Sequence, residues 1–419
     1  MLLARIIEDI ARHDGARILA GLIGLSGDFD TAEEALQEAY ARALDTWPRN
    51  GPPEVPAAWI NTVSRRIVID QFRKNRFSEL PEDIAIPAAP EFDDDVPGIE
   101  DDRLRLMFTC CHPALSRQAS CALALKTLGG LTTRQIARGF LEAESATAQR
   151  IVRAKRKIRD ARIPFEVPDQ KKLPERLGTV LSIIYLIFNE GYVSTDSDSL
   201  IRPDLAAEGI RLAKLAVELM PNEAEALGLL ALLLLTDARR TARLSEEGEL
   251  VPLEDQNRSH WNHSQIQEGL LVLDRAIKFH ASGSYQVQAA IAALHAGAPS
   301  ARETDWKQIA LLYRRLLEQW PTPVIELNAA VAFGMATSFE TALAWIERLE
   351  LEGKLADFHP LYSAKGEMLR RIGKPSMAAE SYRQALLLAT NSAEKRYLIK
   401  RIEECKSASR TVVELIAGP

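Results

Sequence analysis

The residues of this chain that could do chemistry are concentrated in one short segment, FTCCHPALSRQASC, at residues 108–121. It contains Cys110, Cys111 and Cys121, three of the four cysteines in the chain, and also His112. Thiolate and imidazole groups are zinc ligands, and thiols can act as redox switches. Structural zinc sites prefer the spacing C-x₂₋₄-C, however, and adjacent cysteines point in different directions. We therefore interpret these cysteines as small buried side chains and keep metal binding or redox sensing as the alternative.

The sequence contains no phosphate-binding glycine loop, no HExxH motif and no CxxC pair. His260 and His263 flank Trp261, but no acidic or thiol partner is near them in the sequence. We interpret both histidines as surface or loop residues. The sequence therefore predicts a protein that is not an enzyme and that needs no cofactor or metal.

The composition is that of a soluble protein with several domains, since the chain has 419 residues, of which 47% are hydrophobic and 26% charged. Its longest apolar run, ALGLLALLLL at 226–235, is far shorter than the ~20 residues of a membrane span and predicts a buried helix. The N-terminus lacks the apolar core of a signal peptide. We expect a cytoplasmic protein with reduced cysteines and no membrane partner. Strand signals are nearly absent, so we predict an all-α fold.

Charge divides the chain more clearly than composition does. The net charge is −6, yet residues 63–77 and 131–162 are strongly basic, and the proline-rich segment between them, 78–102, carries ten acids and no basic residue. Such a segment cannot bury enough apolar surface to fold. We therefore predict four parts, which are a first domain at 1–77, an acidic linker at 78–102, a second domain at 103–163 and a C-terminal domain at 170–419.

The first domain contains two helices with opposite charge. In DTAEEALQEAYARALDTW, at 30–47, a core face is predicted for Ala32, Ala35, Leu36, Ala39, Tyr40, Ala43, Leu44 and Trp47. The opposite face carries Glu33, Glu34, Gln37 and Glu38, which form either a solvated face or a docking surface for a basic partner. After a loop at 48–56, a second helix directs Ile60, Val63 and Ile67 inward. It keeps Arg65, Arg66, Arg73 and Lys74 for solvent or phosphate.

The second domain has the pattern of a helix-turn-helix. Thr132 and Gln135 form a capping box for a short first helix that runs through Ala137. A second, basic helix is expected after a turn at 139–144, with Ser145 as its N-cap and with Ile151 and Ile158 directed inward. Such a pair presents its second helix to the DNA major groove.

The C-terminal region contains helical repeats. Gly366, Ala378, Tyr382 and Ala385 follow the small and aromatic pattern of a tetratricopeptide repeat, and Ala330 and Ala342 are equivalent residues 36 positions upstream. Small residues let paired helices approach, and the aromatic ring fills the gap. A stacked array offers a concave surface for a protein or peptide, although a purely structural scaffold is the alternative.

Three segments in this order resemble the bacterial RNA polymerase sigma factors of the extracytoplasmic-function group. They are GDFDTAEEALQEAYARALDTW, PAAWINTVSRRIVIDQFRK and HPALSRQASCALALKTLGGLTTRQIARGFLEAESATAQRIVRAKRKIR. With TCCHPALS, YLIFNEGY and LLLLTDARR, the longer chain resembles the subgroup that carries a C-terminal tetratricopeptide-like domain. The turn departs from the usual pattern, because Gly139 comes early and Glu142 and Glu144 lie near the DNA-facing end.

The resemblance implies a sigma factor that binds core RNA polymerase and directs promoter-specific initiation. The acidic helix would dock on the β′ clamp through Glu33, Glu34, Gln37 and Glu38, and the second domain would meet the β flap. The minus-ten strand would be bound by Arg65, Arg66, Arg73 and Lys74. The minus-35 element would be read by Thr147, Gln149, Arg150, Arg153 and Lys157. The C-terminal repeats would bind a regulatory protein or peptide.

The competing interpretation is a helix-turn-helix regulator with a sensing repeat domain that does not act as a sigma subunit. The first domain distinguishes the two, since a regulator of that kind has no use for it.

Overall fold

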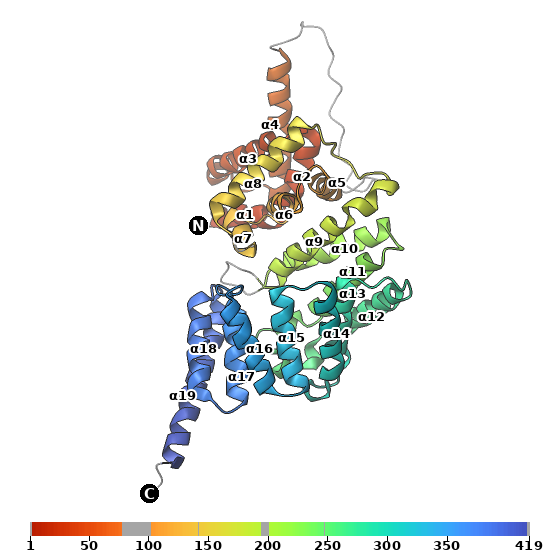
Figure 1. Ribbon diagram of the computed structural model, residues 1–419. Coiled ribbons are helices and arrows are strands. Elements are labelled where there is room, and N and C mark those ends of the chain that lie inside the picture. Colours follow the sequence, from red (N-terminus) through yellow and green to blue (C-terminus); the bar gives the residue numbers. More distant parts are fainter. Residues whose placement is uncertain (1, 78–101, 141, 194–200, 247, 417–419) are drawn as a thin grey trace. The chain divides into compact units, whose positions relative to one another are not determined.

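The computed structural model describes residues 2–77, 102–140, 142–193, 201–246 and 248–416. In these ranges every regular element is a helix, and the only β pairing is the isolated bridge between Leu244 and Leu250. The prediction of an all-α protein is confirmed. Two compact units are present, unit 1 at 1–186 and unit 2 at 187–419 (Figure 1). All of the predicted acidic linker except Asp102 lies outside the described residues.

Unit 1 begins with four helices, α1 (Leu2–His13), α2 (Gly15–Ser26), α3 (Phe29–Asn50) and α4 (Pro56–Phe77). Helices α2, α3 and α4 pack on one another, because each carries an apolar stripe. Most of the core face predicted for α3 is buried, namely Ala32, Ala35, Leu36, Ala39, Ala43 and Trp47. The prediction is wrong for Leu44, which is 53% exposed because it lies at the edge of that stripe.

The end of α3 also differs from the prediction, which placed a loop from residue 48 onward. The helix continues through Pro48 to Asn50, and the backbone N–H of Gly51 caps it by donating to the carbonyl of Trp47. Proline has no N–H to donate to the carbonyl of Leu44, so the helix is weakened at this residue and ends two residues later.

Four more helices of unit 1 follow, α5 (Asp102–Cys110), α6 (Arg117–Thr127), α7 (Thr133–Gly139) and α8 (Glu144–Asp160). The predicted capping box is confirmed: Thr132 Oγ1 accepts from the Gln135 N–H at 3.2 Å, and Gln135 Oε1 accepts from the Thr132 N–H at 2.8 Å. Ile151 and Ile158 are buried between α8 and its neighbours, as predicted.

The predicted N-cap of α8 is wrong. The helix begins at Glu144, so Ala143 rather than Ser145 is the N-cap, and no side chain caps the end. A contact from the preceding turn explains the earlier start, because Glu142 accepts a hydrogen bond from Thr147 Oγ1 at 2.5 Å.

The interpretation of the cysteines as buried side chains is confirmed. All four cysteines are free and buried, and Ser116 caps α6 beside them by accepting from the Ala119 N–H. Burial raises the pKa of Cys110 to about 12 and that of Cys121 to about 11. Within the described ranges, no group of three or more His, Cys, Asp or Glu side chains is placed to hold a metal ion.

Helix α9 (Leu173–Tyr192) begins in unit 1 and ends in unit 2. Its first half belongs with α5 and α6, because Arg176 donates to the carbonyl of Phe108 at 3.0 Å and Arg117 donates to Ser182 at 2.5 Å. Unit 1 therefore extends past residue 170, where we predicted that the C-terminal domain begins.

Unit 2 is a succession of helices, each packed on the next along most of the chain. They are α10 (Pro203–Leu219), α11 (Ala224–Asp237), α12 (His263–Ile277), α13 (Ser284–Gly297), α14 (Trp306–Gln319), α15 (Pro323–Ala336), α16 (Phe339–Glu352), α17 (His359–Arg371), α18 (Pro375–Leu388) and α19 (Ser392–Ile416). The apolar run at 226–235 is buried inside α11, as predicted. None of the described helices is long and apolar enough to cross a membrane.

The close approach predicted from small residues is present in unit 2. A Cβ added to Gly366 of α17 would lie 2.8 Å from a ring carbon of Tyr382 in α18, so the glycine makes room for the ring. One pair of helices upstream, a Cβ on Gly334 would lie 2.5 Å from the Cβ of Ala342. Small side chains therefore set the spacing of these helices, while the assignment to tetratricopeptide repeats stays a prediction.

Candidate functional site

The beginning of α3 presents a cluster of carboxylates in a fixed arrangement. Asp28 is the N-cap and accepts from the Thr31 N–H at 2.8 Å, and Ser26 holds Asp28 through a 2.9 Å bond to its carbonyl. Acids at this end are stabilised by the helix dipole. The four side chains predicted to bind polymerase lie on the same helix: Glu33 is half-buried, and Glu34, Gln37 and Glu38 are exposed.

Helix α4 carries the arginines predicted to bind the minus-ten strand. Arg66 and Arg73 are exposed, and Arg73 lies 3.8 Å from Asp70 on its own helix. Arg65 is half-buried: burial lowers the pKa of its guanidinium, and the charge of Asp102 on α5 raises it in part. The side chain of Lys74 lies outside the described residues. An edge-on contact between Trp47 and Trp59, with ring centroids 5.5 Å apart, joins α3 to α4.

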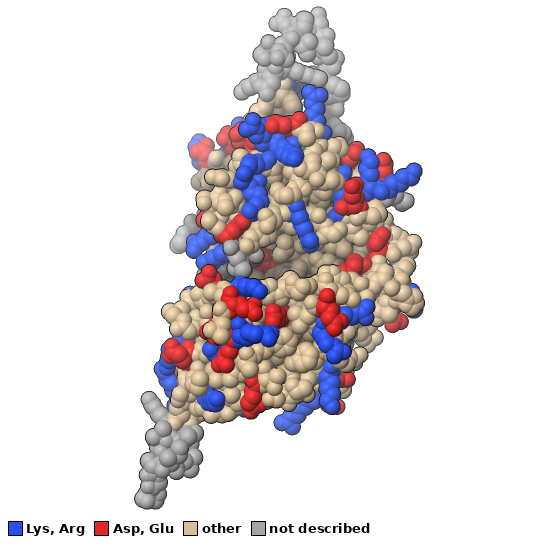
Figure 2. Space-filling model, in the orientation of Figure 1, with Lys and Arg blue, Asp and Glu red and all other residues tan. Residues whose placement is uncertain are grey.

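Helix α8 presents a basic outer face (Figure 2). Gln149, Arg153 and Lys157, three of the five residues predicted to read the minus-35 element, are exposed. Arg153 and Lys157 line an open hollow together with Arg156. These side chains are therefore available to an anionic ligand such as a phosphate backbone.

The other two predicted reading residues are occupied by Glu142. Thr147 is fully buried and donates to Glu142, and Arg150 donates to both carboxylate oxygens, one of them at 2.7 Å. The hydrogen bond from Arg150 is the main reason that the pKa of Glu142 is lowered, and the bond from Thr147 adds to it. The glutamate that departs from the usual turn pattern is thus the anchor of Arg150.

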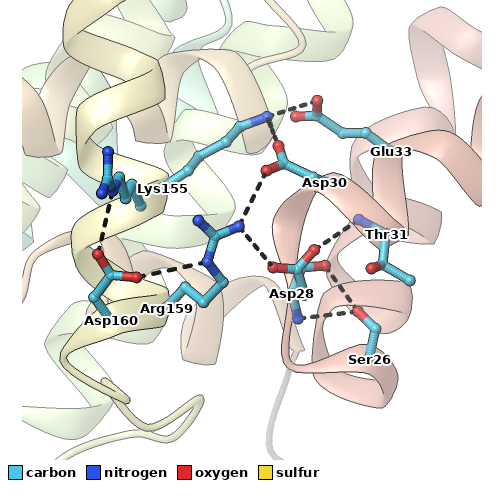
Figure 3. A network of polar contacts seen from close by, with 9 residues as sticks. Ser26, Asp28, Asp30, Thr31, Glu33, Lys155, Arg159 and Asp160 are labelled. Carbon is cyan, nitrogen blue, oxygen red and sulfur yellow. Dashed lines mark hydrogen bonds and ion pairs between the residues drawn. The ribbon is translucent and has the colours of Figure 1, made fainter. Parts of the chain in front are cut away.

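The other side of α8 carries two basic residues that sequence reasoning missed. The ammonium of Lys155 lies 2.6 Å from Glu33 Oε2 and 3.2 Å from Asp30 Oδ1 (Figure 3). Arg159 lies 3.9 Å from Asp30 and 4.0 Å from Asp28. An aspartate just before a helix is a recognisable N-cap signal, so Asp28 could have been found from the sequence. The pairing could not, because 122 residues separate Lys155 from Glu33.

Two segments of the chain match known protein families. Residues 11–78, which include α2, α3 and α4, match Sigma-70 region 2. Residues 176–277, from α9 to α12, match a family of unknown function (DUF6596). Helices α2 to α4 are therefore similar to a sigma-factor domain, which supports a sigma-factor-like role in transcription initiation and binding to core RNA polymerase and promoter DNA.

A relative that matches most of the chain is "Uncharacterized protein R00370" of Rhizobium meliloti (strain 1021). It is 41% identical over 403 residues, which cover 94% of this chain and 95% of the relative. The chain belongs to the same family as this protein. Both its N-terminal and its C-terminal units are thus part of one shared architecture.

Proposed function

We propose that this protein is a sigma subunit of the extracytoplasmic-function group, which binds core RNA polymerase and directs promoter-specific initiation. The observation that carries the proposal is that the Sigma-70 region 2 match covers the acidic α3 and the arginine-bearing α4. Acids suit a basic clamp surface, and arginines suit phosphate and stacked bases. Such a subunit acts by binding in the cytoplasm and is not an enzyme.

Each charged helix takes one role in the proposal. Glu33, Glu34, Gln37 and Glu38 bind the β′ clamp, and Arg65, Arg66, Arg73 and Lys74 bind the melted minus-ten strand. Helix α8, whose exposed Arg153 and Lys157 face solvent, enters the major groove at the minus-35 element with Gln149 and Arg150 at its N-terminal end. Thr147, predicted to read bases, is buried and acts there only through its bond to Glu142. The surrounding helices α6 and α7 meet the β flap.

Unit 2 is the proposed regulatory part, in which successive helix pairs form a tetratricopeptide-like surface for a protein or peptide. Support comes from the close helix contacts at Gly366 and Gly334, which are the spacing that such pairs require. This domain either inhibits or assists the sigma helices. Altering its surface would raise transcription initiation if it inhibits them and lower initiation if it assists them.

The test is in vitro transcription with the full chain and core RNA polymerase of Rhizobium meliloti, the organism of the relative. We expect initiation at specific start sites on genomic templates only when the protein is present. Sequence-specific DNA binding without any effect on core polymerase would instead support the helix-turn-helix regulator.

Charge reversals on α3 test whether core polymerase binds the acids of this helix or responds only to the net charge of the chain. Glu34→Lys together with Glu38→Lys places positive charge on the exposed side of α3, and we expect core binding to weaken ~10-fold or more because like charges now face the clamp. Glu8→Lys together with Asp9→Lys on α1 is the matched control, since both acids are also exposed and lie outside the proposed surface. Equal binding by all variants would contradict the assignment of α3.

A further inference from the structure

The contact between α3 and α8 uses Glu33, a residue of the predicted polymerase-binding surface, and the side of α8 that carries no residue predicted to bind DNA. Lys155 is only 12% exposed, and both of its carboxylate partners, Asp30 and Glu33, lie on α3. A lysine this buried is retained only when its charge is paired. The two ion-pair distances of 2.6 and 3.2 Å meet that requirement (Figure 3).

An apolar contact joins the segment after α8 to α2, the helix that packs on α3. Phe165, which follows α8, lies against Gly24 of α2 so closely that a Cβ on the glycine would be 2.8 Å from its ring. The backbone next to this ring is also fixed, because Thr109 Oγ1 donates to the carbonyl of Pro164 at 3.1 Å. The contact therefore depends on shape as well as on charge.

A third contact reaches α4. Asp102, the first residue of α5, and Arg65 both lie near Gly21, because a Cβ there would be 3.6 Å from Asp102 Oδ2 and 3.9 Å from Arg65 Nη1. The charge of Asp102 acts on the Arg65 guanidinium. Helix α5 packs on α2 at this point. One residue of the proposed clamp surface and one of the proposed minus-ten surface are thus engaged by the segment that contains α5 to α8.

We propose that the acid cluster of α3, defined as Asp28, Asp30 and Glu33, is a shared docking surface that α8 occupies in the free protein and that core polymerase takes over. This inference rests on the proposed function. Because α8 and the clamp cannot use Glu33 at the same time, polymerase binding requires α8 to leave α3. The apparent affinity for polymerase is then reduced by the fraction of molecules that are closed.

The geometry of α8 makes the effect specific to polymerase. Arg153 and Lys157 point away from α3 and line the open hollow, whereas Lys155 points into the contact. The closed form therefore leaves the exposed DNA-facing side chains accessible while it covers part of the clamp surface. Release of α8 changes core binding without changing duplex binding.

Two variants open the contact by independent means in the full-length protein. Lys155→Gln removes the buried charge, and Gly24→Ala leaves every charge in place but pushes against Phe165. Alanine also favours the helical state of α2 by up to ~1 kcal/mol relative to glycine, so loss of folding is not expected. The matched controls are Lys171→Gln, an exposed lysine just before α9, and Gly178→Ala on α9, where a Cβ would meet nothing within 4 Å.

The first measurement is binding to core polymerase without DNA. We expect Lys155→Gln and Gly24→Ala to bind about 3- to 10-fold more tightly than the natural chain, and both controls to bind as it does. Binding to a promoter duplex without polymerase should be the same for Lys155→Gln and the natural chain. Unchanged polymerase affinity in both opening variants would overturn the shared docking surface.

The second measurement needs no polymerase and reports the closed form directly. A water-soluble carbodiimide joins an amine to a carboxylate only when they touch, so mass spectrometry should find Lys155 linked to Glu33 or Asp30 in the free protein. The link should decrease when core polymerase is added. Absence of the link in the free protein would overturn the closed form. If the link formed but no variant bound core polymerase, the proposed sigma function would be rejected. The competition between α8 and polymerase for α3 would be rejected with it.

Discussion

At the scale of single residues, Glu142 is the side chain whose role differs most from its appearance in the sequence. Its charge near the DNA-facing end of α8 would repel phosphate, yet it is paired with Arg150 and accepts from Thr147. We expect Glu142→Gln to release Arg150 and lower the preference for the specific duplex by about 3- to 10-fold. The measurement is fluorescence anisotropy on a duplex selected from random sequence and on its scrambled version.

The control for this prediction is Glu144→Gln. Glu144 is exposed two residues further along, so the variant removes the same charge without freeing Arg150. Both variants should bind scrambled DNA slightly more tightly because one repulsive charge is gone. If the two also lost the same amount of preference, Glu142 would act through charge alone and not through the position of Arg150.

The buried thiols give a second residue-scale prediction. Because thiolate is the reactive form, and burial raises the pKa of Cys110 to about 12 and of Cys121 to about 11, almost no thiolate is present at pH 8. We expect alkylation by iodoacetamide to be at least ~100-fold slower in the folded chain than in urea. Mass spectrometry of digested samples checks this for each cysteine. Fast labelling of Cys110 or Cys121 in the folded chain would restore the redox alternative.

At the scale of elements, the periodic helices could be predicted from the sequence and their ends could not. The stripe of α3 and the inward isoleucines of α8 follow from a period of 3.6 residues, which depends only on local sequence. The end of α3 and the start of α8 depend on Pro48 continuing the last turn and on Glu142 bonding to Thr147. Local rules for helix caps do not include these contacts. The predicted N-cap of α8, Ser145, is therefore wrong, and the helix is preceded by Ala143.

The contact between α17 and α18 supports an element-scale prediction. In Gly366→Ala, the new methyl group would lie 2.8 Å from the ring of Tyr382, which is itself buried and donates to Glu367 at 3.0 Å. The ring cannot move away freely, so we expect a loss of ~1–3 kcal/mol in the free energy of unfolding. Urea unfolding followed by circular dichroism measures it.

Gly297→Ala is the control for that variant. It changes a glycine at the end of α13 in the same unit, where a Cβ would meet nothing within 4 Å. We expect its stability to stay within ~0.5 kcal/mol of the natural chain. An equal effect of both variants would mean that backbone freedom, and not the contact with Tyr382, explains the result.

At the scale of the whole molecule, charge division and fold class could be predicted, whereas the pairing of distant surfaces could not. Two basic segments and an acidic one are visible in composition alone. That Lys155 lies on Glu33 depends on how the described helices of unit 1 pack, which no local pattern encodes. The same limit applies to the first half of α9, which was predicted to lie in the C-terminal domain but which Arg176 and Arg117 join to unit 1.

Unit 2 has a built-in sensitivity to acid that can be measured on the full chain. His295 packs edge-on against Trp306, with centroids 5.2 Å apart. Burial, followed by the charges of Arg239 and Arg258, lowers the pKa of His295 to about 4. In the unfolded chain the His295 imidazole therefore takes up a proton near pH 6.5, whereas in the folded chain it does so only near pH 4. The stabilising effect is complete above pH 6.5 and is lost progressively as the pH falls, by up to about 3 kcal/mol in total.

We expect the free energy of unfolding to fall by about 2 kcal/mol between pH 6.5 and pH 5, before most carboxylates begin to titrate. His295→Gln should make that slope smaller, because glutamine is similar in polarity and does not titrate. The slope that remains is expected from His359 of unit 2, because burial lowers its pKa as well. His280→Gln is the control, since His280 is exposed in the loop after α12 and should keep the slope. Urea titrations at three pH values measure the difference. Equal slopes for the natural chain and His295→Gln would mean that another group of unit 2, and not this buried imidazole, sets its response to acid.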